Sequence, residues 1–273
     1  MAYEEIIYTV ENKNIALITL NRPDAMNALT MKTHDEIREA IEEANQDANI
    51  RVIVITGAGR GFCSGDDVKS IFRSGEGYDE KGEQRIKDRQ FTALELGKLR
   101  SGGGGGLLEI NKPSIAAVNG AAVGYGCDLA LMCDMRVASE NARFGEVFLR
   151  VGLIPDEGLI LLPRLVGLAK AYELVLTTDI IDAKEAERIG LVNKVVPPEE
   201  LMTATMELAT KIANKPPISV RLAKEGIRRG LSMPLDEFRQ WHAFAFSFVQ
   251  HTEDHKEGAQ AFVEKREPVF KGK

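Results

Sequence analysis

The sequence predicts an α/β fold that contains a parallel β-sheet and ends in a region of helices alone. Two short apolar runs, residues 52–56 and 114–118, have the composition of strands that are buried on both faces, as strands of parallel sheets are. Helix-like segments separate the strands, and this order requires crossover connections. Beyond Pro198 every segment has a helical pattern. We therefore expect a core over residues 1–197 and a helical region over residues 198–273.

The composition is that of an ordinary globular protein, and it argues against several classes of partner. Of the 273 residues, 28% are charged and 44% are hydrophobic, and the formal net charge is −6. Because there is no long basic block, we do not expect nucleic acid as the main partner. No run of 18 apolar residues exists, and the N-terminus MAYEEIIYTV lacks a signal-peptide pattern. We therefore expect no membrane contact and a cytoplasmic location.

The cysteines and histidines give no sign of a metal site. Cys63, Cys127 and Cys133 lack Cys-x-x-Cys spacing, and no histidine lies at a ligand spacing from them. The histidines lie outside the segments that carry the motifs described below: His34, His242, His251 and His255. We expect reduced structural thiols, no bound metal and no catalytic histidine.

The first elements follow from apolar patterns and turn residues. Residues 6–10 and 15–20 predict two strands joined by the polar turn ENKN. Thr33 with Glu36 matches a capping box at the start of a helix. Apolar residues then recur at helical spacing: Ile37, Ala40, Ile41 and Ala44.

A glycine-rich loop at residues 57–67, GAGRGFCSGDD, follows the first buried strand. Its glycines do not have the G-x-G-x-x-G spacing of a dinucleotide-binding turn. We interpret it as a loop that presents backbone amides, that of Ser64 among them, to a ligand. A short helix is expected at 67–72 and a longer one at 83–100. The glycine tract at 102–106 is either a flap beside the ligand or a solvated loop, and the second is favoured.

The stretch NKPSIAAVNGAAVGYGCDLALMCD is the part around which the rest is organised. A strand at 114–118 leads into a turn, and an apolar helix at 126–133 begins after Gly124 and Gly126. The first amides of a helix lack intrahelical partners and lie at the positive end of its dipole. The glycines let a carbonyl oxygen approach the Tyr125 amide, which would supply half of an oxyanion hole. The alternative is a tight strand-to-helix turn without a ligand.

The remaining chain alternates short elements and then becomes helical. Before Pro198 we expect a strand at 135–139, an extended segment at 143–150, a loop at 151–158, helices at 159–167 and onward to 176, a helix at 183–189 capped by Asp182, and a strand at 193–196. After it we expect helices at 199–214, 218–229, 235–250 and 254–265. The third carries Phe238, Trp241, Phe244, Phe246 and Phe248. One helix face cannot bury so many aromatics, which predicts packing between subunits.

Four motifs make the sequence similar to the crotonase (enoyl-CoA hydratase/isomerase) superfamily. They are LNRPDAMNAL at 20–29, GRGFCSGDDV at 59–68, the stretch at 112–134 and FVEKR at 262–266, and they span nearly the whole chain in the family's order. The resemblance implies a spiral of ββα turns with C-terminal helices that build trimers, often paired as hexamers. It also implies a coenzyme A thioester as the substrate, with no separate cofactor.

The resemblance also implies which residues of this chain form the oxyanion hole and bind the substrate. The family's oxyanion hole uses two backbone amides, which fall on Ser64 and Tyr125 here. Such a hole stabilises a thioester enolate, and the loss of one donor costs about 3 kcal/mol. The implied substrate-binding residues are Arg22, Cys63, Gly65, Asp67, Gly124, Gly126, Phe148 and Lys265. Of these, Lys265 matches a lysine that reaches a phosphate of a neighbouring subunit's ligand.

The acids that face the acyl chain separate the activities of this family. Hydratases resemble one another in having two, which hold a water between them. The first position is Asp128 here, but the second is Phe148, which cannot hold a proton. A third acid, Asp156, matches the acid/base of several enoyl-CoA isomerases in the family. One positioned acid/base contributes about 10²–10⁴-fold to a rate.

This acid count favours a double-bond shift, in which Asp156 moves one proton along an enoyl chain. Phe148, Leu153 and Ile154 would form an apolar wall that raises the pKa of Asp156. One alternative is a hydratase that uses Asp128 with Asp156 or Glu146. Another is an acyl-CoA-binding protein without catalysis.

Simpler structural roles remain open for the same acids. Asp156 could cap the helix that begins near Gly158, and Asp128 could stabilise a helix dipole. Glu146 and Glu157 are expected in solvent, although either could replace the missing glutamate.

Overall fold

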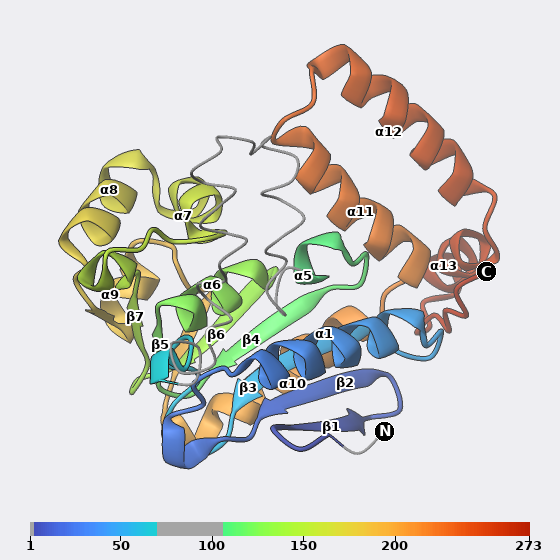
Figure 1. Cartoon of the computed structure of the whole chain (residues 1–273). Helices are drawn as coiled ribbons and strands as arrows, with labels where there is room; N and C mark the ends of the chain where they lie inside the picture. Colours follow the sequence, from blue (N-terminus) through green and yellow to red (C-terminus); the bar gives the residue numbers. More distant parts are fainter. Residues whose placement is uncertain (1–2, 70–105) are drawn as a thin grey trace, which may run out of the picture.

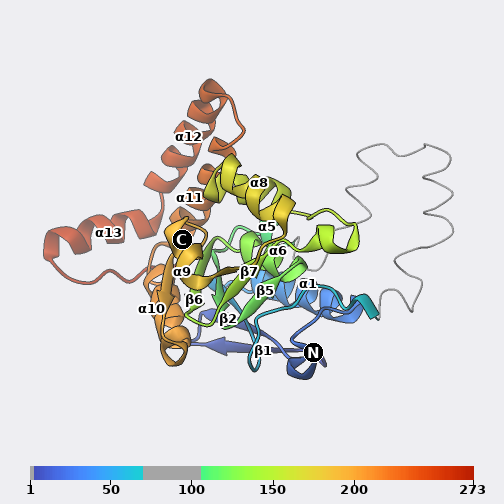
Figure 2. The same ribbon diagram turned by 90° about the vertical axis from the view of Figure 1, so that its left-hand side faces the viewer.

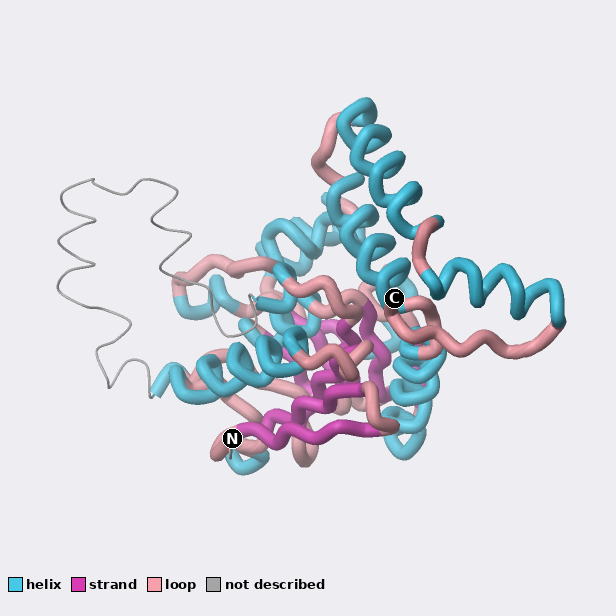
Figure 3. Tube along the Cα trace, turned by 90° about the vertical axis from the view of Figure 1, so that its right-hand side faces the viewer, coloured by secondary structure: helices cyan, strands magenta, loops and turns pink. Residues whose placement is uncertain are grey.

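The computed structural model describes residues 3–69 and 106–273. The helix expected at 83–100 lies wholly outside these residues, and the helix expected at 67–72 and the glycine tract at 102–106 lie partly outside them. The described part is a mixed α/β fold, as the sequence predicts. Its strands form a central layer with helices around it (Figure 3).

The main sheet has six strands in the order β1-β2-β3-β4-β6-β9. These strands are β1 (Ile6–Glu11), β2 (Ile15–Leu20), β3 (Val52–Gly57), β4 (Ser114–Val118), β6 (Met135–Ser139) and β9 (Lys194–Val196). β1 and β2 form an antiparallel hairpin, and all later neighbours are parallel. A second sheet, in the order β5-β7-β8, contains β5 (Ala121–Val123), β7 (Arg143–Gly145) and β8 (Ile181–Asp182). The predicted buried parallel strands are thus confirmed.

The two faces of the main sheet are covered by different helices. Ile53 and Ile55 belong to one buried cluster with apolar residues of α1 (Met31–Gln46). Val52 and Val54 belong to another, with apolar residues of α10 (Leu201–Ala213). This alternation is the period of two that a strand imposes on its side chains. Figure 1 shows α1 on one side of the sheet and α10 on the other.

The helix α1 begins earlier than the sequence pattern suggests. Its N-cap is Thr30, whose hydroxyl accepts a hydrogen bond from the Thr33 amide, while the Thr33 hydroxyl accepts one from the Thr30 amide. The predicted capping box of Thr33 with Glu36 is therefore wrong. Glu36 is buried and accepts hydrogen bonds from the amides of Glu5 and Ile6 instead. A long-range contact with the first strand decides the role of this glutamate.

Shorter helices and 3₁₀ turns complete the part of the fold that precedes the C-terminal helical region. They are α5 (Gly106–Glu109), α6 (Tyr125–Met132), α7 (Gly158–Val166), α8 (Leu168–Thr177) and α9 (Ala183–Arg188), with short 3₁₀ turns η1 (Pro23–Ala25), η3 (Phe148–Val151) and η4 (Pro198–Glu200). The Asp182 side chain caps α9 as predicted. The segment 143–150 is extended only to Gly145, and then turns into η3.

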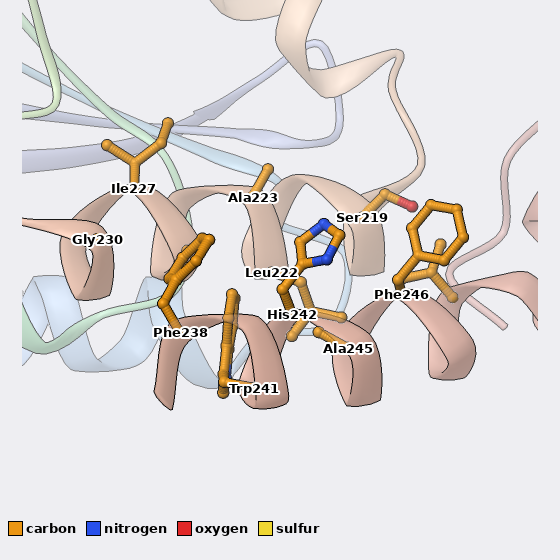
Figure 4. A pocket seen from close by; sticks show the side chains of 12 residues that line it. Ser219, Leu222, Ala223, Ile227, Gly230, Phe238, Trp241, His242, Ala245 and Phe246 are labelled. Carbon is orange, nitrogen blue, oxygen red and sulfur yellow. The ribbon is translucent and has the colours of Figure 1, made fainter. Parts of the chain in front are cut away.

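The last three helices project from the sheet layer. α11 (Pro217–Gly230) and α12 (Leu235–Gln250) form a hairpin, and α13 (Glu253–Glu264) follows (Figures 1 and 2). An apolar groove of about 560 Å³ lies between α11 and α12, with Phe238 and Trp241 among its lining residues (Figure 4). On α12 the side chains of Phe244 and Phe248 are exposed. Packing between subunits is still a prediction for these residues.

A carboxylate ties the hairpin to the sheet. Asp134 accepts hydrogen bonds from the Ser114 amide at 2.8 Å and the Ser114 hydroxyl at 3.1 Å, and it pairs with Lys224 Nζ at 2.7 Å and Arg228 Nη2 at 3.3 Å. The Lys224 side chain is buried, so this ion pair compensates a desolvated charge. None of the helices that the structure describes has the length and apolar character needed to cross a bilayer.

Candidate active site

Backbone hydrogen bonds join the glycine-rich loop to the chain that leads into α6. The Cys63 amide donates to Ala121 O at 2.8 Å, and the Val123 amide donates to Cys63 O at 3.1 Å. A Cβ at Gly126 would lie only 2.2 Å from Cys63 O. Only glycine permits so close an approach of two backbone segments. The structure therefore brings the predicted binding residues Cys63 and Gly126 together.

The two amides predicted for an oxyanion hole are close to Gly65. Tyr125 is the first residue of α6, where N–H groups point out of the helix. A Cβ at Gly65, whose φ is +91°, would lie 3.4 Å from Tyr125 N. Gly124 has a φ of +55° and turns the chain into the helix. The Ser64 amide donates to Met26 O at 3.1 Å, so it can reach a substrate oxygen only after this bond opens.

Polar contacts hold the turn that carries Arg22, one of the substrate-binding residues that the resemblance implies. Arg22 Nη2 is 3.1 Å from Asp67 Oδ2, and Arg22 Nε is 3.5 Å from Glu5 Oε1. The Asn27 side chain accepts from the Arg22 amide at 2.9 Å and donates to Gly61 O at 2.8 Å. The two predicted residues Arg22 and Asp67 thus form an ion pair with each other.

Four acidic side chains converge beside α6, and two of them were expected in solvent: Glu146 and Glu157. Asp128, in the first turn of this helix, is fully buried, and Glu146 is 1% exposed. Glu146 was expected in solvent, and that expectation is wrong. It follows β7 directly, and β7 lies beside β5, the strand that leads into α6. This pairing carries Glu146 to the helix.

Asp156 and Glu157 approach the same place from the loop before α7. The Asp156 amide donates to Asp128 Oδ2 at 3.0 Å. One oxygen from each of Asp128, Asp156 and Glu157 lies within 4.8 Å of the others. Glu157 is half-buried instead of solvated, and it is the N-cap residue of α7 but makes no side-chain capping bond. The structure thus brings both predicted catalytic acids together.

Burial raises the pKa of both carboxyls at the centre of this cluster. For Asp128 the main cause is desolvation, followed by the charge of Glu146, while the hydrogen bond from Asp156 opposes the rise. For Glu146 desolvation is again the main cause, and hydrogen bonds with Cys127 and Asp128 oppose it. Since both pKa values are raised, the pair retains a proton at a pH where exposed carboxyls are ionised.

The same acids meet a distance condition for binding a cation, through Asp128, Asp156 and Glu157. Mg²⁺ and Ca²⁺ require six or more oxygen ligands and a site that supplies negative charge. Among the described residues, this cluster offers three such oxygens, one from each side chain.

The apolar wall predicted around Asp156 is only partly present. Phe148 is buried, at the start of η3. Leu153 and Ile154 are 43% and 67% exposed, so the prediction that they enclose the acid is wrong for the single chain. The loop that carries them turns their side chains to the surface.

Two further residues concern the predicted site: His34, which the sequence left without a role, and Lys265, which the resemblance placed at a substrate. His34 was assigned to no site, but its ring lies 4.9 Å from the Tyr125 ring, and its Nε2 is 2.9 Å from Asp66 Oδ1. No motif marks it, because its place follows from how α1 packs. Lys265 ends α13, which lies away from α6 in both Figure 1 and Figure 2. Its predicted contact concerns a neighbouring subunit and remains a prediction.

Comparison with known proteins agrees with the fold and identifies the family. The model of the family described as "Enoyl-CoA hydratase/isomerase" matches residues 10–273. The chain is 41% identical to a crotonyl-CoA hydratase of Syntrophomonas wolfei, with 99% of each chain covered. It is 40% identical to a short-chain-enoyl-CoA hydratase of Clostridium acetobutylicum, with 97% of each covered.

Solved structures give the same result. An enoyl-CoA hydratase structure from Geobacillus kaustophilus superimposes with a TM-score of 0.87 at 38% identity, covering 99% of both chains. One from Bacillus anthracis gives 0.86 at 36% identity, covering 99% of this chain and all of the other. The class of protein is therefore a crotonase-fold enzyme.

The chain belongs to the enoyl-CoA hydratase/isomerase family. The names of these relatives support the hydratase alternative better than the isomerase hypothesis that the acid count favoured.

Proposed function

We propose that this protein is an enoyl-CoA hydratase that adds water across the 2,3 double bond of a short acyl-CoA such as crotonyl-CoA. The main support is the distance between the acids. A water that donates to or accepts from two oxygens at about 2.8 Å can bridge atoms up to about 5.6 Å apart. Oxygens of Asp128 and Asp156 lie within 4.8 Å of each other, a separation that suits one bound water. Asp156 thus takes the role of the second hydratase acid, whose position in this chain is occupied by Phe148.

The reaction divides its protons between the two acids. Asp156 accepts a proton from water as the water oxygen bonds to C3, and the double-bond electrons move toward the thioester oxygen. The amides of Tyr125 and Ser64 stabilise this oxygen, once Ser64 has left Met26 O. Asp128, which burial keeps protonated, gives its proton to C2. A proton that passes back from Asp156 to Asp128 restores the starting state, so the product contains substrate plus one water.

The rest of the assignment extends this proposal. Arg22 and Asp67 would border the adenine end of the coenzyme, and Lys265 would reach a phosphate of a ligand bound by a neighbouring subunit. The exposed aromatics Phe244 and Phe248 support self-association as a trimer or hexamer. We place the enzyme in the cytoplasm, in fatty-acid-related coenzyme A metabolism.

A double-bond isomerase is the second candidate, because of Phe148. This buried apolar side chain occupies the position at which the resemblance places the second acid of hydratases. An isomerase needs a single proton carrier and no bound water. Products distinguish the two functions, since hydration gives a 3-hydroxyacyl-CoA and isomerisation only a shifted double bond.

Conservative variants test the proposed acids. We expect Asp128→Asn and Asp156→Asn each to lower the rate of crotonyl-CoA hydration by about 10²–10⁴-fold. Affinity for an acyl-CoA, measured by calorimetry, should change little. Glu140→Gln, which removes an exposed carboxyl, is the matched control. Hydration retained in Asp156→Asn would refute its role, and binding without turnover in the wild type would favour the non-catalytic alternative.

A further inference from the structure

Glu146 and Asp128 face each other inside the protein. A Cβ built on Gly158 would lie 2.4 Å from Asp128 Oδ1 and 2.9 Å from Glu146 Oε1. The two oxygens are therefore at most about 5.3 Å apart, the sum of these distances. Both side chains are at most 1% exposed. The absent side chain of Gly158 leaves the space in which the two carboxyls meet.

Among the described residues, a thiol and a carboxyl are the donors that face the oxygens that meet there. Asp128 Oδ2 accepts the Asp156 amide, but neither Asp128 Oδ1 nor either oxygen of Glu146 is paired with a backbone amide or a cationic side chain. The Glu146 carboxyl contacts the Asp128 carboxyl and the Cys127 thiol. A carboxyl can donate to another carboxylate only when it holds a proton. A buried pair of this kind is satisfied when it shares one proton.

Within residues 3–69 and 106–273, the charged groups that act on the pair are acids, and none is a compensating cation. Asp128 faces the acids Glu146, Asp156 and Glu157, and Glu146 faces Asp156 as well as Cys127. These groups come from α6, from the segment after β7 and from the loop before α7. Each negative neighbour favours retention of the shared proton.

We propose that Glu146 is a positioning residue that shares one proton with Asp128 and thereby keeps Asp128 in its acid form. This inference deepens the proposed hydratase function and rests on it only for the role of Asp128 as the acid that protonates C2. During that step the Asp128 O–H bond breaks and the C2–H bond forms. The two carboxylates then face each other as anions, which drives the return of a proton from Asp156.

The shared proton can be measured without any substrate. Carboxyl ¹³C resonances of aspartate-labelled protein are followed against pH in the wild type, and Asp128→Asn identifies the signal of Asp128. We expect this signal to titrate well above the ordinary aspartate range. In Glu146→Gln the midpoint should fall by about one to two pH units, because the neighbouring charge is gone. Glu140→Gln, at an exposed position, should leave it unchanged.

The second measurement is the pH dependence of crotonyl-CoA hydration. We expect the alkaline limb of kcat/KM to move to lower pH in Glu146→Gln by the same shift as the Asp128 signal. A residue with a merely structural role would lower the rate without moving the limb.

The outcomes separate this inference from the proposed function. An ordinary Asp128 titration in the wild type, or an Asp128 midpoint unmoved by Glu146→Gln, would overturn the shared proton. An alkaline limb that does not follow the shifted midpoint would overturn the positioning role. If the midpoint shifts as expected but no enoyl-CoA is hydrated, the proton sharing stands and the hydratase function fails.

Discussion

Adding one methyl group at Gly126 tests the packing that brings the two oxyanion amides together. The new Cβ of Gly126→Ala would lie 2.2 Å from Cys63 O, whereas real Cβ atoms essentially never come within 3.0 Å of another heavy atom. The helix start and the glycine-rich loop must therefore separate by at least about 0.8 Å, the difference between these distances. Ser64 follows Cys63 directly, so its amide moves relative to that of Tyr125.

This displacement sets the size of the effect. A misplacement of about 1 Å can lower a rate by about 10²-fold, which corresponds to about 2.7 kcal/mol of transition-state stabilisation. Overpacking of the buried contact should also lower the free energy of unfolding by about 1–3 kcal/mol. We therefore expect kcat/KM for crotonyl-CoA to fall about 100-fold in a variant that still folds.

The assay follows the loss of absorbance of the conjugated thioester, with thermal unfolding measured on the same samples. Gly258→Ala is the matched control, because its Cβ would contact the Phe270 ring at an ordinary 3.4 Å within α13. Its activity should equal that of the wild type. Activity of Gly126→Ala within threefold of the wild type, in a protein of unchanged stability, would refute the argument that this close contact positions the amides.

Three further predictions concern stability and assembly. Asp134→Asn removes the carboxylate that faces the buried Lys224, so urea denaturation should show a loss of about 3 kcal/mol; a loss below 1 kcal/mol would contradict the role of this ion pair. The pKa of Glu146 is raised from 4.5 to about 7 in the fold, so its contribution to stability is full below pH 4.5 and is lost as pH rises toward 7. Between pH 4.5 and 7 the free energy of unfolding should therefore fall less steeply with pH in Glu146→Gln than in the wild type, by about 1.4 kcal/mol per pH unit. The same slope in the wild type and the variant would count against this prediction. Phe244, which is 74% exposed, should lie between subunits, so Phe244→Glu should lower the sedimentation coefficient; a wild type that stays monomeric at all concentrations would disprove this.

The elements that the sequence predicted best are those with purely local causes. β2 and β4 have the predicted bounds, because each is a mainly apolar run with polar or turn residues at both ends. The start of α1 was missed because Thr30 and Thr33 are both competent caps. Glu36 instead accepts hydrogen bonds from the amides of Glu5 and Ile6, about 30 residues earlier, so it is not part of a capping box.

The site shows the same division between local and distant causes. The glycines at 124 and 126 and the acids Asp128 and Asp156 follow from motifs, and the structure brings the two acids together. Glu146 stands alone between Gly145 and Val147 in the sequence, so nothing local marks it as buried. Its place beside Asp128 depends on the pairing of β5 with β7, which no sequence pattern reveals.

The most direct test of this account is hydration of crotonyl-CoA in H₂¹⁸O, with the products resolved by mass spectrometry. The wild type should give a 3-hydroxyacyl-CoA that contains one ¹⁸O atom, and Asp156→Asn should give almost none under the same conditions. A product with a migrated double bond and no added oxygen would contradict the account and return the protein to the isomerase class.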